Sequence, residues 1–288
     1  MTGTAPETKV YPEDSWVQIN LPLSGYPVPP PLYGRLADLA REVLAAGARE
    51  FFFMHKPPGL RIRFQTADPA DTPALRAELL ARTRALYDRG LLAAPPVGTV
   101  YEPESYLFGG DAAMPWVHRL FTADALAWLD CHRAAGLPAD GPGRPPAGWR
   151  ISLLLLRELL AGLHIVGWEH RGVWEAVRSD TGRALTPADP ADTERRRAEQ
   201  GIRAWWARPR DEALAALPDG WREPLDRHRA AVRRAADEWR TGYFEAGTAI
   251  RGPRRAAAYA VIFHWNRGAL PAGRQCLLTE ALAADGAA

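Results

Sequence analysis

The segment Phe51-Phe-Phe-Met54-His-Lys56-Pro-Pro-Gly59-Leu-Arg-Ile-Arg-Phe64 decides the fold, because it holds two apolar runs on either side of a tight turn. Aromatic and β-branched residues favour strands, whereas consecutive prolines followed by glycine favour a turn. We therefore predict one strand over residues 51–54 and another over residues 60–64, joined by the turn at residues 56–59.

Two further strands and two helices surround this pair. Residues 16–21 alternate between apolar and polar side chains, which is typical of a strand, and residues 98–101 are a short fourth strand. A proline-rich turn at 28–32 starts a helix whose apolar stripe consists of Leu36, Leu39, Ala40, Val43 and Leu44. Asp71 is the expected N-cap of a second helix, with proline in its first turn. The order β-α-β-β-α-β predicts a ferredoxin-like split βαβ sheet.

The rest of the chain contains only helical patterns. We expect helices at about 113–135, 149–166, 168–179, 191–207, 219–245, 253–269 and 273–284, with loops at 138–148 and 181–192. The predicted fold class is therefore α+β, with the sheet at the N-terminus packed against a larger helical C-terminal part. We expect one domain over residues 1–288, with an α/β part at 15–110 and a helical part at 111–288.

The composition argues against several kinds of protein. The 288 residues include 36 Lys and Arg against 34 Asp and Glu, and a net charge of +2 argues against a nucleic-acid-binding protein. Two widely separated cysteines, Cys131 and Cys276, are typical of a reduced, cytoplasmic protein. No apolar run reaches the length of a membrane span, and residues 1–14, which we expect to be loose, lack a signal-peptide core. We therefore expect neither a nucleic acid nor a membrane as a partner.

A first polar cluster follows the predicted fourth strand, where an acidic and aromatic segment ends in Gly109 and Gly110. Two glycines allow the backbone to turn sharply. We expect this turn to lie at the end of that strand, where Glu104, Ser105 and Tyr106 face a cleft.

Arg61 and Arg63 form a second cluster. They lie two residues apart on a predicted strand, so both guanidinium groups project from the same face of the sheet. Two such cations repel each other unless an anion lies between them. One interpretation is that they pair with Glu104 or Asp111, and another is that they bind a carboxylate or a peptide. Both interpretations remain open at this point.

His264 lies within the apolar predicted helix at 253–269. A lone histidine there is either a hydrogen-bonded core residue or a catalytic group. Asn266 and Arg267, which follow it, are expected to cap that helix or to tie it to the sheet. The 11 tryptophans, Trp168 among them, are interpreted as packing residues. The arginine-rich segment at 193–210 is interpreted as a solvated face, with contact to an acidic peptide as the alternative.

The sequence does not indicate metal, nucleotide or acyl-serine chemistry. The seven histidines are scattered and lack the Cys/His spacing of a metal site. The chain also lacks a glycine-rich phosphate loop and a Gly-x-Ser-x-Gly turn. We therefore expect the protein to need no cofactor.

Three segments, in the same order, resemble the lantibiotic dehydratase C-terminal, or thiopeptide-type biosynthesis, family. Residues 51–64 resemble its FFxRYKDPGxHLRLR segment, and residues 104–110, followed by Met114 and residues 121–124, resemble its ExxRYGG…F..DS segment. Residues 263–267 resemble its closing H…NR helix, and Trp174 stands among the positions of its middle helices. The resemblance spans nearly the whole chain.

This resemblance implies that the chain acts on a ribosomally made precursor peptide. The ancestral activity of the family is elimination of glutamate from glutamylated Ser or Thr, which leaves a dehydroamino acid. In those eliminases an arginine pair, the Glu and Arg of the second segment and a His carry the reaction. Arg61, Arg63 and Glu104 match these positions, whereas Leu107 replaces the arginine and Phe108 replaces the tyrosine.

Loss of one guanidinium from an anion site costs about 2–4 kcal/mol of transition-state stabilisation. The chain therefore resembles most the stand-alone thiopeptide pyridine synthases, which join two dehydroalanines by a formal (4+2) aza-cycloaddition and then expel water and the leader peptide. The implied catalytic residues are Glu104, Ser105, Tyr106, Tyr243 and His264, and the implied substrate-binding residues are Arg61, Arg63, Asn266 and Arg267. The implied partners are the modified precursor peptide, with its leader and dehydrated core, and other enzymes of the pathway.

Two alternatives to pyridine synthesis remain. In the first, the chain eliminates glutamate as the partner of a tRNA-dependent dehydratase, and Arg119 or Arg251 replaces the lost cation. In the second, the chain is not catalytic, and it binds the precursor peptide to present it to partner enzymes.

Overall fold

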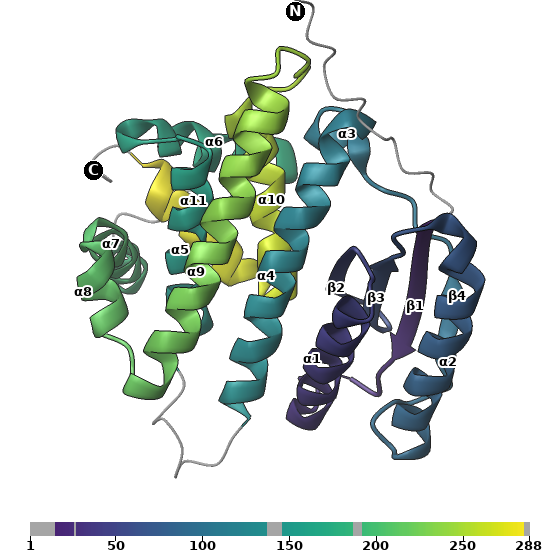
Figure 1. The fold of residues 1–288 in the computed structure, drawn as a ribbon. Helices are drawn as coiled ribbons and strands as arrows, with labels where there is room; N and C mark the ends of the chain where they lie inside the picture. The colour runs from purple at the N-terminus through teal and green to yellow at the C-terminus, as the bar shows by residue number, and fades with distance from the viewer. Residues whose placement is uncertain (1–14, 26, 137–145, 187–191, 285–288) are drawn as a thin grey trace, which may run out of the picture.

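The computed structural model describes residues 15–25, 27–136, 146–186 and 192–284 (Figure 1). Four strands form one antiparallel sheet in the order β2-β3-β1-β4: β1 (Trp16–Pro22), β2 (Glu50–Lys56), β3 (Gly59–Gln65) and β4 (Val97–Thr99). Helix α1 (Pro30–Ala45) connects β1 to β2, and α2 (Thr72–Asp88) connects β3 to β4. This is the ferredoxin-like arrangement, so the predicted α+β fold class is confirmed.

The two faces of the sheet differ in polarity. The face covered by α1 and α2 is apolar, and its buried strand residues are Val17, Ile19, Leu21, Phe51, Phe53, Leu60, Ile62 and Phe64 (Figure 1). Because successive residues of a strand point to opposite faces, the residues between them share the other face. The register places Arg63 opposite Gln18 and Arg61 opposite Asn20 on that second face. On this second face, β1 and β3 therefore present polar side chains, whereas β2 presents the apolar Phe52 and Met54.

The helical part follows β4. It consists of α3 (Ser105–Phe108), α4 (Met114–Ala135), α5 (Gly148–Gly162), α6 (His170–Thr181), α7 (Thr193–Ala207), α8 (Arg210–Ala215), α9 (Asp219–Trp239), α10 (Pro253–Arg267) and α11 (Ala272–Ala283). Short 3-10 turns precede α2, α4 and α6 at Pro69–Asp71, Asp111–Ala113 and Gly167–Glu169 (η4). Among the residues that the structure describes, no strand follows β4, as predicted.

Helix α4 joins the helical part to the sheet (Figure 1). It lies along β2, which is an edge strand, and Thr122 Oγ1 of this helix accepts a hydrogen bond from the backbone N–H of Phe51 at 3.0 Å. The exposed edge of the sheet is thereby covered by a helix. On the outer side, Arg41 of α1 pairs with Asp130 of α4 at 2.6 Å.

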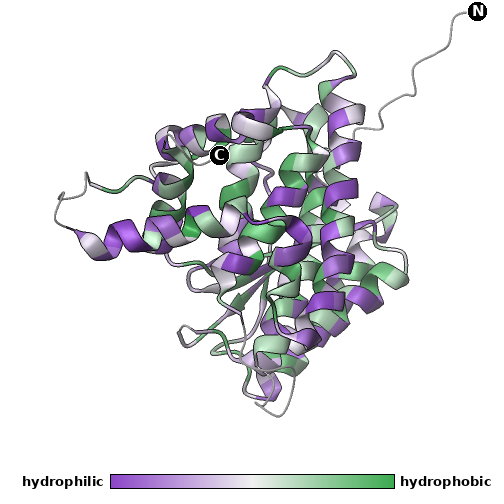
Figure 2. Ribbon diagram, turned by 90° about the vertical axis from the view of Figure 1, so that its left-hand side faces the viewer, coloured by the Kyte–Doolittle hydropathy of each residue, from purple (hydrophilic) through white to green (hydrophobic). Residues whose placement is uncertain are grey.

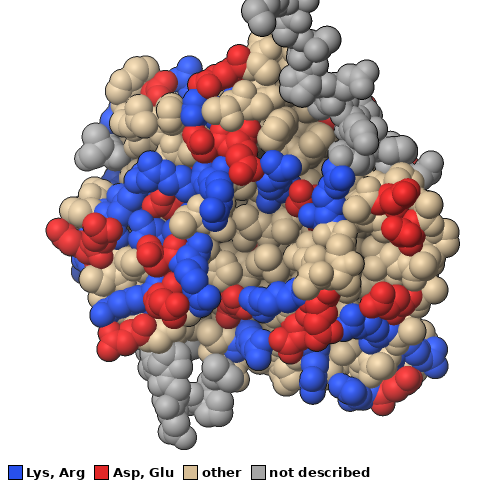
Figure 3. Space-filling view, viewed as in Figure 1, with Lys and Arg blue, Asp and Glu red and all other residues tan. Residues whose placement is uncertain are grey.

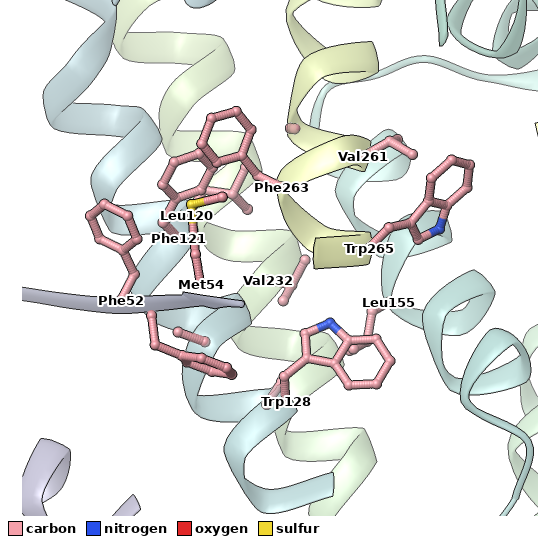
Figure 4. Packing of buried hydrophobic residues seen from close by; sticks show 14 of the residues in the cluster. Phe52, Met54, Leu120, Phe121, Trp128, Leu155, Val232, Val261, Phe263 and Trp265 are labelled. Carbon is pink, nitrogen blue, oxygen red and sulfur yellow. The ribbon is translucent and has the colours of Figure 1, made fainter. Parts of the chain in front are cut away.

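Strand β2 and the helices share one apolar core. Figure 4 shows Phe52 and Met54 pointing from β2 toward Leu120 and Phe121 of α4, with Phe263 of α10 beside them. The rings of Phe121 and Phe263 stack with centroids 4.9 Å apart. Figure 2 shows hydrophilic and hydrophobic residues alternating along the helices, and Figure 3 shows acidic and basic side chains mixed over one face of the surface.

Several predictions about elements need correction. Asp71 is the N-cap residue of α2, as predicted, but its side chain makes no capping hydrogen bond; in the 3-10 turn before α2, Asp68 accepts the N–H of Ala70. Helix α8 was not predicted, and the predicted helix at 219–245 is α-helical only to Trp239, after which Arg240–Phe244 forms a π-helical turn. Trp168 is not a packing residue, since 69% of it is exposed.

Some predictions fall on segments that the structure does not describe. These are residues 1–14, residues 138–145 of the predicted loop at 138–148, and residues 187–191 of the loop at 181–192. Among the described helices, none alone is long and apolar enough to cross a membrane. Only Gly148–Gly162 and Gly167–Thr181, taken together and bent by 115°, have the length and composition for it.

Candidate functional site

A hollow of about 340 Å³ lies on the face of the sheet away from α1 and α2, and we call it the sheet hollow. It is lined by Gln18, Lys56, Arg61, Arg63, Val100, Glu102, Pro103, Glu104 and Tyr106. The strands supply the first four of these residues, and the segment after β4 supplies the others. Three cations and two carboxylates therefore share one hollow, which suits the binding of peptide groups and of small anions.

Arg63 is the most firmly held of the cations. Only 3% of it is exposed, and its Nε donates to Gln18 Oε1 at 2.6 Å. Gln18 is fixed in turn, since its Nε2 donates to Thr99 Oγ1 at 2.6 Å. The guanidinium also lies over the rings of Phe52 and Tyr101, 4.9 and 4.5 Å from their centroids. Burial lowers the pKa of Arg63, and the nearby Tyr101 and Glu104 oppose this effect.

The predicted ion pairs of the arginine cluster are not present. Among the described residues, neither Arg61 nor Arg63 forms an ion pair, although Glu104 lines the same hollow. Asp111 lies elsewhere, in a neighbouring hollow. The strand alternation was therefore right about the shared face of the two arginines, and both remain able to bind an external group.

The predicted site residues at 104–106 belong to a short helix and not to a strand end. Strand β4 stops at Thr99, and Glu104 takes the N-cap position of α3. Gly109 ends α3 in the left-handed conformation with φ 104°, and the next glycine donates its N–H to the Ser105 carbonyl at 2.8 Å. The two glycines therefore terminate a helix and not a strand. Within this short helix, 71% of Tyr106 is exposed.

Strand β4 ends at Thr99, before the predicted residue 101, because the residues that follow it pack into the core. Tyr101 is 3% exposed and packs edge-on against Trp16, with ring centroids 5.1 Å apart. Its hydroxyl lies 2.9 Å from Nε2 of the buried His118. Pro103 has no N–H for a strand ladder. Leu107 packs against the core beyond this point and does not line the sheet hollow.

A second hollow of about 350 Å³ adjoins the first, and we call it the α3 hollow. It is lined by Ser105, Tyr106, Gly109, Gly110, Asp111, Ile250 and Arg251. Arg251 Nη2 donates to the backbone carbonyl of Tyr106 at 3.1 Å, which holds its guanidinium beside α3. Because Tyr106 lines both hollows, its exposed side chain stands between them.

Tyr243 lies beneath the two glycines. It is 1% exposed, and its hydroxyl donates to the carbonyl of Gly109 at 2.8 Å. A Cβ added to Gly109 would lie 2.2 Å from that hydroxyl, so the glycine is needed for this close approach. Tyr243 lines neither hollow, and its contacts are those of a residue that positions the end of α3.

His264 lies in the interior of the helical part, with 3% of its surface exposed. Its Nδ1 is 2.6 Å from Asp124 Oδ1, and Arg267 Nε donates to the other oxygen of Asp124 at 2.5 Å. Burial alone would raise the pKa of Asp124, but His264 and Arg267 lower it to about 2. Because an ionised carboxylate can only accept, we assign the donor in this pair to Nδ1–H of His264; the indole Nε1 of Trp128 also lies 3.1 Å from this nitrogen.

Ser152 completes this network without becoming a nucleophile. Its Oγ is 2.9 Å from His264 Nε2 and accepts the indole N–H of Trp265 at 3.1 Å. A serine, a histidine and an aspartate in contact have the composition of a catalytic triad. Ser152 is 0% exposed, however, so no substrate can reach its hydroxyl. The geometry is that of a hydrogen-bonded core histidine, one of the two interpretations of His264.

Asn266 and Arg267 tie α10 to the rest of the fold. The backbone carbonyl of Asn266 accepts a hydrogen bond from His55 Nδ1 of β2 at 2.7 Å. The carbonyl of Arg267 lies 2.8 Å from His132 Nε2 of α4, and its side chain is 1% exposed. Neither residue lines the sheet hollow or the α3 hollow.

The structure separates the two arginines that were considered as replacements for the lost cation. Arg119 pairs with Glu238 at 2.8 Å and lines neither hollow, whereas Arg251 lines the α3 hollow. Gln18 and Lys56 were not predicted as site residues. Gln18 had a signal, because it alternates with apolar residues on a strand and shares its face with Asn20. Within the described chain, no group of His, Cys, Asp or Glu is arranged to hold a metal ion.

Three comparisons with known proteins add to this geometry. The sequence model of the family described as lantibiotic biosynthesis dehydratase C-term matches residues 16–284. The fold is similar to that of the tRNA-dependent lantibiotic dehydratase MibB from Microbispora sp. 107891, with a TM-score of 0.59 and 17% identity. That similarity covers 98% of this chain but only 28% of MibB. TsrL is similar with a TM-score of 0.48, 17% identity and 92% coverage of each chain. No curated protein sequence matches.

Proposed function

The chain belongs to the lantibiotic biosynthesis dehydratase C-terminal family, and from this premise we propose that it modifies a ribosomally made precursor peptide as a pyridine synthase. In this reaction two dehydroalanines of one peptide are joined by a formal (4+2) aza-cycloaddition. Loss of water and of the leader peptide then leaves the central pyridine of a thiopeptide macrocycle. The sheet hollow and the α3 hollow are the proposed site.

The observation that carries the proposal is the set of cations around the sheet hollow. Among the described residues, Arg61 and Arg63 are the only guanidinium groups that line it, and Lys56 accompanies them. Leu107, at the position where the family's eliminases have an arginine, packs against the core. A site that lacks one guanidinium should stabilise a departing glutamate less well by about 2–4 kcal/mol. A reaction that expels no amino-acid anion does not need this charge.

Two adjoining hollows also suit a reaction between two parts of one peptide. The main barrier to such a cyclisation is the entropy of bringing two distant alkenes together, and fixed binding of both segments removes much of it. The sheet hollow and the α3 hollow, of about 340 and 350 Å³, are separated by Tyr106. Each hollow would hold one dehydroalanine segment, with the reacting carbons meeting beside α3.

The residues of this region can supply the proton transfers. One backbone amide must shift its proton from nitrogen to oxygen, and that oxygen later leaves as water after it accepts a further proton. Glu104 and the exposed phenol of Tyr106 line the sheet hollow, and Ser105 lines the α3 hollow. We assign the proton transfers to these three residues. Arg61 and Arg63 would bind carbonyl oxygens of the substrate.

Glutamate elimination is the second candidate, and Arg251 is the observation that favours it. Its guanidinium lies beside α3, in the hollow that Ser105 and Tyr106 also line. Among the described residues it forms no ion pair. A glutamyl carboxylate bound between Arg251 and the sheet cations would restore part of the missing charge.

Mass spectrometry distinguishes these candidates. The enzyme would be incubated with a leader-bearing peptide that contains azoles and two dehydroalanines, and separately with a glutamylated peptide. A macrocycle together with a released leader amide supports the proposal, whereas loss of glutamate without a ring supports elimination. If both peptides bind but neither changes, the chain is a non-catalytic binding protein.

Variants extend the same experiment. Glu104→Gln is expected to lower the rate of ring formation by about 100-fold, because a proton-transfer group contributes on this order. Glu223→Gln, on the exposed side of α9, is the matched control and should retain the wild-type rate. Equal rates for both variants would remove Glu104 from the mechanism.

A further inference from the structure

A third hollow of about 360 Å³ lies in the helical part and shares no lining residue with the other two. It lies between the end of α5, the turn η4 and the junction of α7 with α8. In Figure 1 these helices are on the opposite side of the molecule from β4. We call it the Trp168 hollow.

Exposed apolar side chains gather at the hollows of this molecule. Among the described residues, six large apolar side chains are exposed: Val97, Val100, Tyr106, Val166, Trp168 and Ile250. All but Val97 line at least one of the three hollows, and Val166 and Trp168 line the third, with 61% and 69% of their surfaces exposed. Exposed apolar surface concentrated in a concave site is typical of a binding surface.

The opposite wall of the Trp168 hollow is rigid. Trp206 of α7 packs edge-on against the fully buried Trp174, with ring centroids 5.6 Å apart, and against His170 at 5.3 Å. On the near side, Glu169 Oε2 accepts the N–H of Val166 at 3.1 Å, which fixes the turn that carries Trp168. The hollow is therefore formed without a ligand.

The polar lining of the hollow is basic. Arg157 and Arg210 line it, and no carboxylate is among its lining residues. The Arg157 guanidinium lies 5.9 Å from the ring centroid of Trp206, and its Nη1 donates to the carbonyl of Arg208 at 2.7 Å. The buried Glu158, which does not line the hollow, forms ion pairs with Arg229 at 2.9 Å and with Arg210 at 3.5 Å. Among the described residues, Arg157 forms no ion pair, so its guanidinium faces the apolar wall without a carboxylate, whereas Arg210 shares the buried Glu158.

We propose that the Trp168 hollow binds a peptide segment that carries both carboxylates and large apolar side chains. The apolar side chains would lie between Trp168 and Trp206, and the carboxylates would meet Arg157 and Arg210. This inference rests on the proposed function in one respect, namely that the substrate is a peptide. The segment would be the leader of that substrate, held away from the reacting core. Simultaneous binding at two sites would raise the effective concentration of the core at the sheet hollow.

The first experiment measures binding alone. The probe is a blocked octapeptide of sequence Glu-Leu-Glu-Phe-Leu-Glu-Leu-Glu, titrated into the full chain by calorimetry, and its matched control has Gln at every Glu. We expect the acidic probe to bind at least about tenfold more tightly than the Gln probe. Its affinity should fall as the salt concentration rises. No binding of the acidic probe, or equal binding of both probes, would overturn the proposal. Displacement of the probe by free glutamate at equal concentration would also overturn it, because the hollow would then be a simple anion site.

Variants locate the binding. Trp168→Ala removes a mostly exposed side chain and should lower the affinity for the acidic probe by about tenfold. Arg210→Gln should lower this affinity by a similar factor. The matched controls are Val97→Ala, exposed but outside all three hollows, and Arg227→Gln on α9, whose side chain is 71% exposed. Both controls should bind within about twofold of the wild type. Unchanged binding by Trp168→Ala and Arg210→Gln would place the probe elsewhere and reject the assignment.

The binding experiment can be interpreted separately from the experiment that tests the proposed pyridine synthesis. Binding is measured without turnover, so a chain that forms no pyridine still gives an answer here. If ring formation is observed, Trp168→Ala should raise KM for a leader-bearing substrate and leave unchanged the rate on a core peptide whose leader is replaced by an N-acetyl group, which leaves as acetamide. An equal effect on both substrates would mean that Trp168 acts on the fold and not on leader binding.

Discussion

The carboxylate of Asp124 lies in the interior of the helical part, where it accepts hydrogen bonds from His264 and Arg267 at 2.6 and 2.5 Å. Arg267 is 1% exposed, so its positive charge has almost no contact with water. A buried cation of this kind is tolerated only because a carboxylate compensates it. The pKa of Asp124, which is lowered to about 2 despite burial, is consistent with that role.

Asp124→Asn should therefore be strongly destabilising. The variant leaves the Arg267 charge buried without its partner, which costs about 3–5 kcal/mol in the free energy of unfolding. Asp130→Asn, on the same helix, is the matched control: Asp130 contacts Arg41 and His228 near the surface, where water can replace these contacts, and the substitution should cost about 1 kcal/mol. Urea denaturation of both variants at pH 7 gives the comparison. Equal costs would show that the buried charge is compensated by other means.

The candidate site shows which residues the sequence could predict. Arg61 and Arg63 were placed correctly on one face because strand alternation is a local property of the chain. Tyr243 and His264 were predicted at the site but lie in the interior, where they contact Gly109 and Asp124. These partners are separated from them by more than a hundred residues, so packing and not local pattern decides which way they point. The roles of all the site residues stay predictions.

At the scale of elements, α5 and α9 cross at a glycine. A Cβ added to Gly162 at the end of α5 would lie 2.5 Å from the carbonyl oxygen of Arg233 and 2.6 Å from the Cβ of Ala236. Both of these atoms belong to α9, and one of them is backbone, so neither can move alone. The close approach of the two helices depends on the missing side chain.

Gly162→Ala should push these helices apart and lower the free energy of unfolding by about 1–3 kcal/mol. Gly201→Ala is the matched control, because Gly201 lies within α7 and a Cβ there meets nothing within 4 Å. It should stabilise the protein by about 0.5–1 kcal/mol, as alanine is the better helix former. Thermal unfolding of the two variants should shift the midpoint in opposite directions. A shift in the same direction would contradict this account of the crossing.

Long elements with a clear period were predicted well, and short ones were not. The ferredoxin-like order followed from strands and helices of several turns each, whose apolar spacing is visible in the sequence. Helix α8 lies between Pro209 and Pro218 and has only 6 residues, which are too few to show a helical repeat of apolar side chains. The 4 residues of α3 were mistaken for the end of a strand, because two glycines terminate either kind of element.

At the scale of the whole molecule, two histidines join the sheet to the helical part. His55 of β2 has its Nδ1 2.7 Å from the carbonyl of Asn266 and its Nε2 2.7 Å from the hydroxyl of Tyr33. Nδ1 must donate to the carbonyl, and Nε2 can then accept from the phenol, so the contacts fit a neutral ring. Burial, and then His132 nearby, lower the pKa of His55 to about 4, and burial lowers that of His132 to about 4 as well.

These two pKa values, together with that of the buried His118, which burial and Arg63 lower to about 3, predict how stability depends on pH. An unfolded histidine takes up its proton near pH 6.5, whereas the folded protein resists protonation until about pH 4. The unfolded state therefore binds more protons in this window, and the stability present above pH 6.5 is lost as the pH falls to about 4. The loss is at most about 3 kcal/mol for each histidine. Asp124 contributes little in this window, because its unfolded pKa of 3.8 and its folded pKa of about 2 both lie below pH 4.

Urea denaturation at pH 7 and at pH 4.5 measures the loss, and a variant assigns it to the junction between sheet and helices. His132→Phe keeps a ring against Tyr33, on which His132 stacks at 4.2 Å, but cannot take up a proton. Whatever its stability at pH 7, the free energy of unfolding of the variant should fall less between pH 7 and pH 4.5 than that of the wild type. His164→Asn changes an exposed histidine and should leave the loss unaltered. If His132→Phe and the wild type lose stability equally, protonation at this junction does not control the acid sensitivity of the fold.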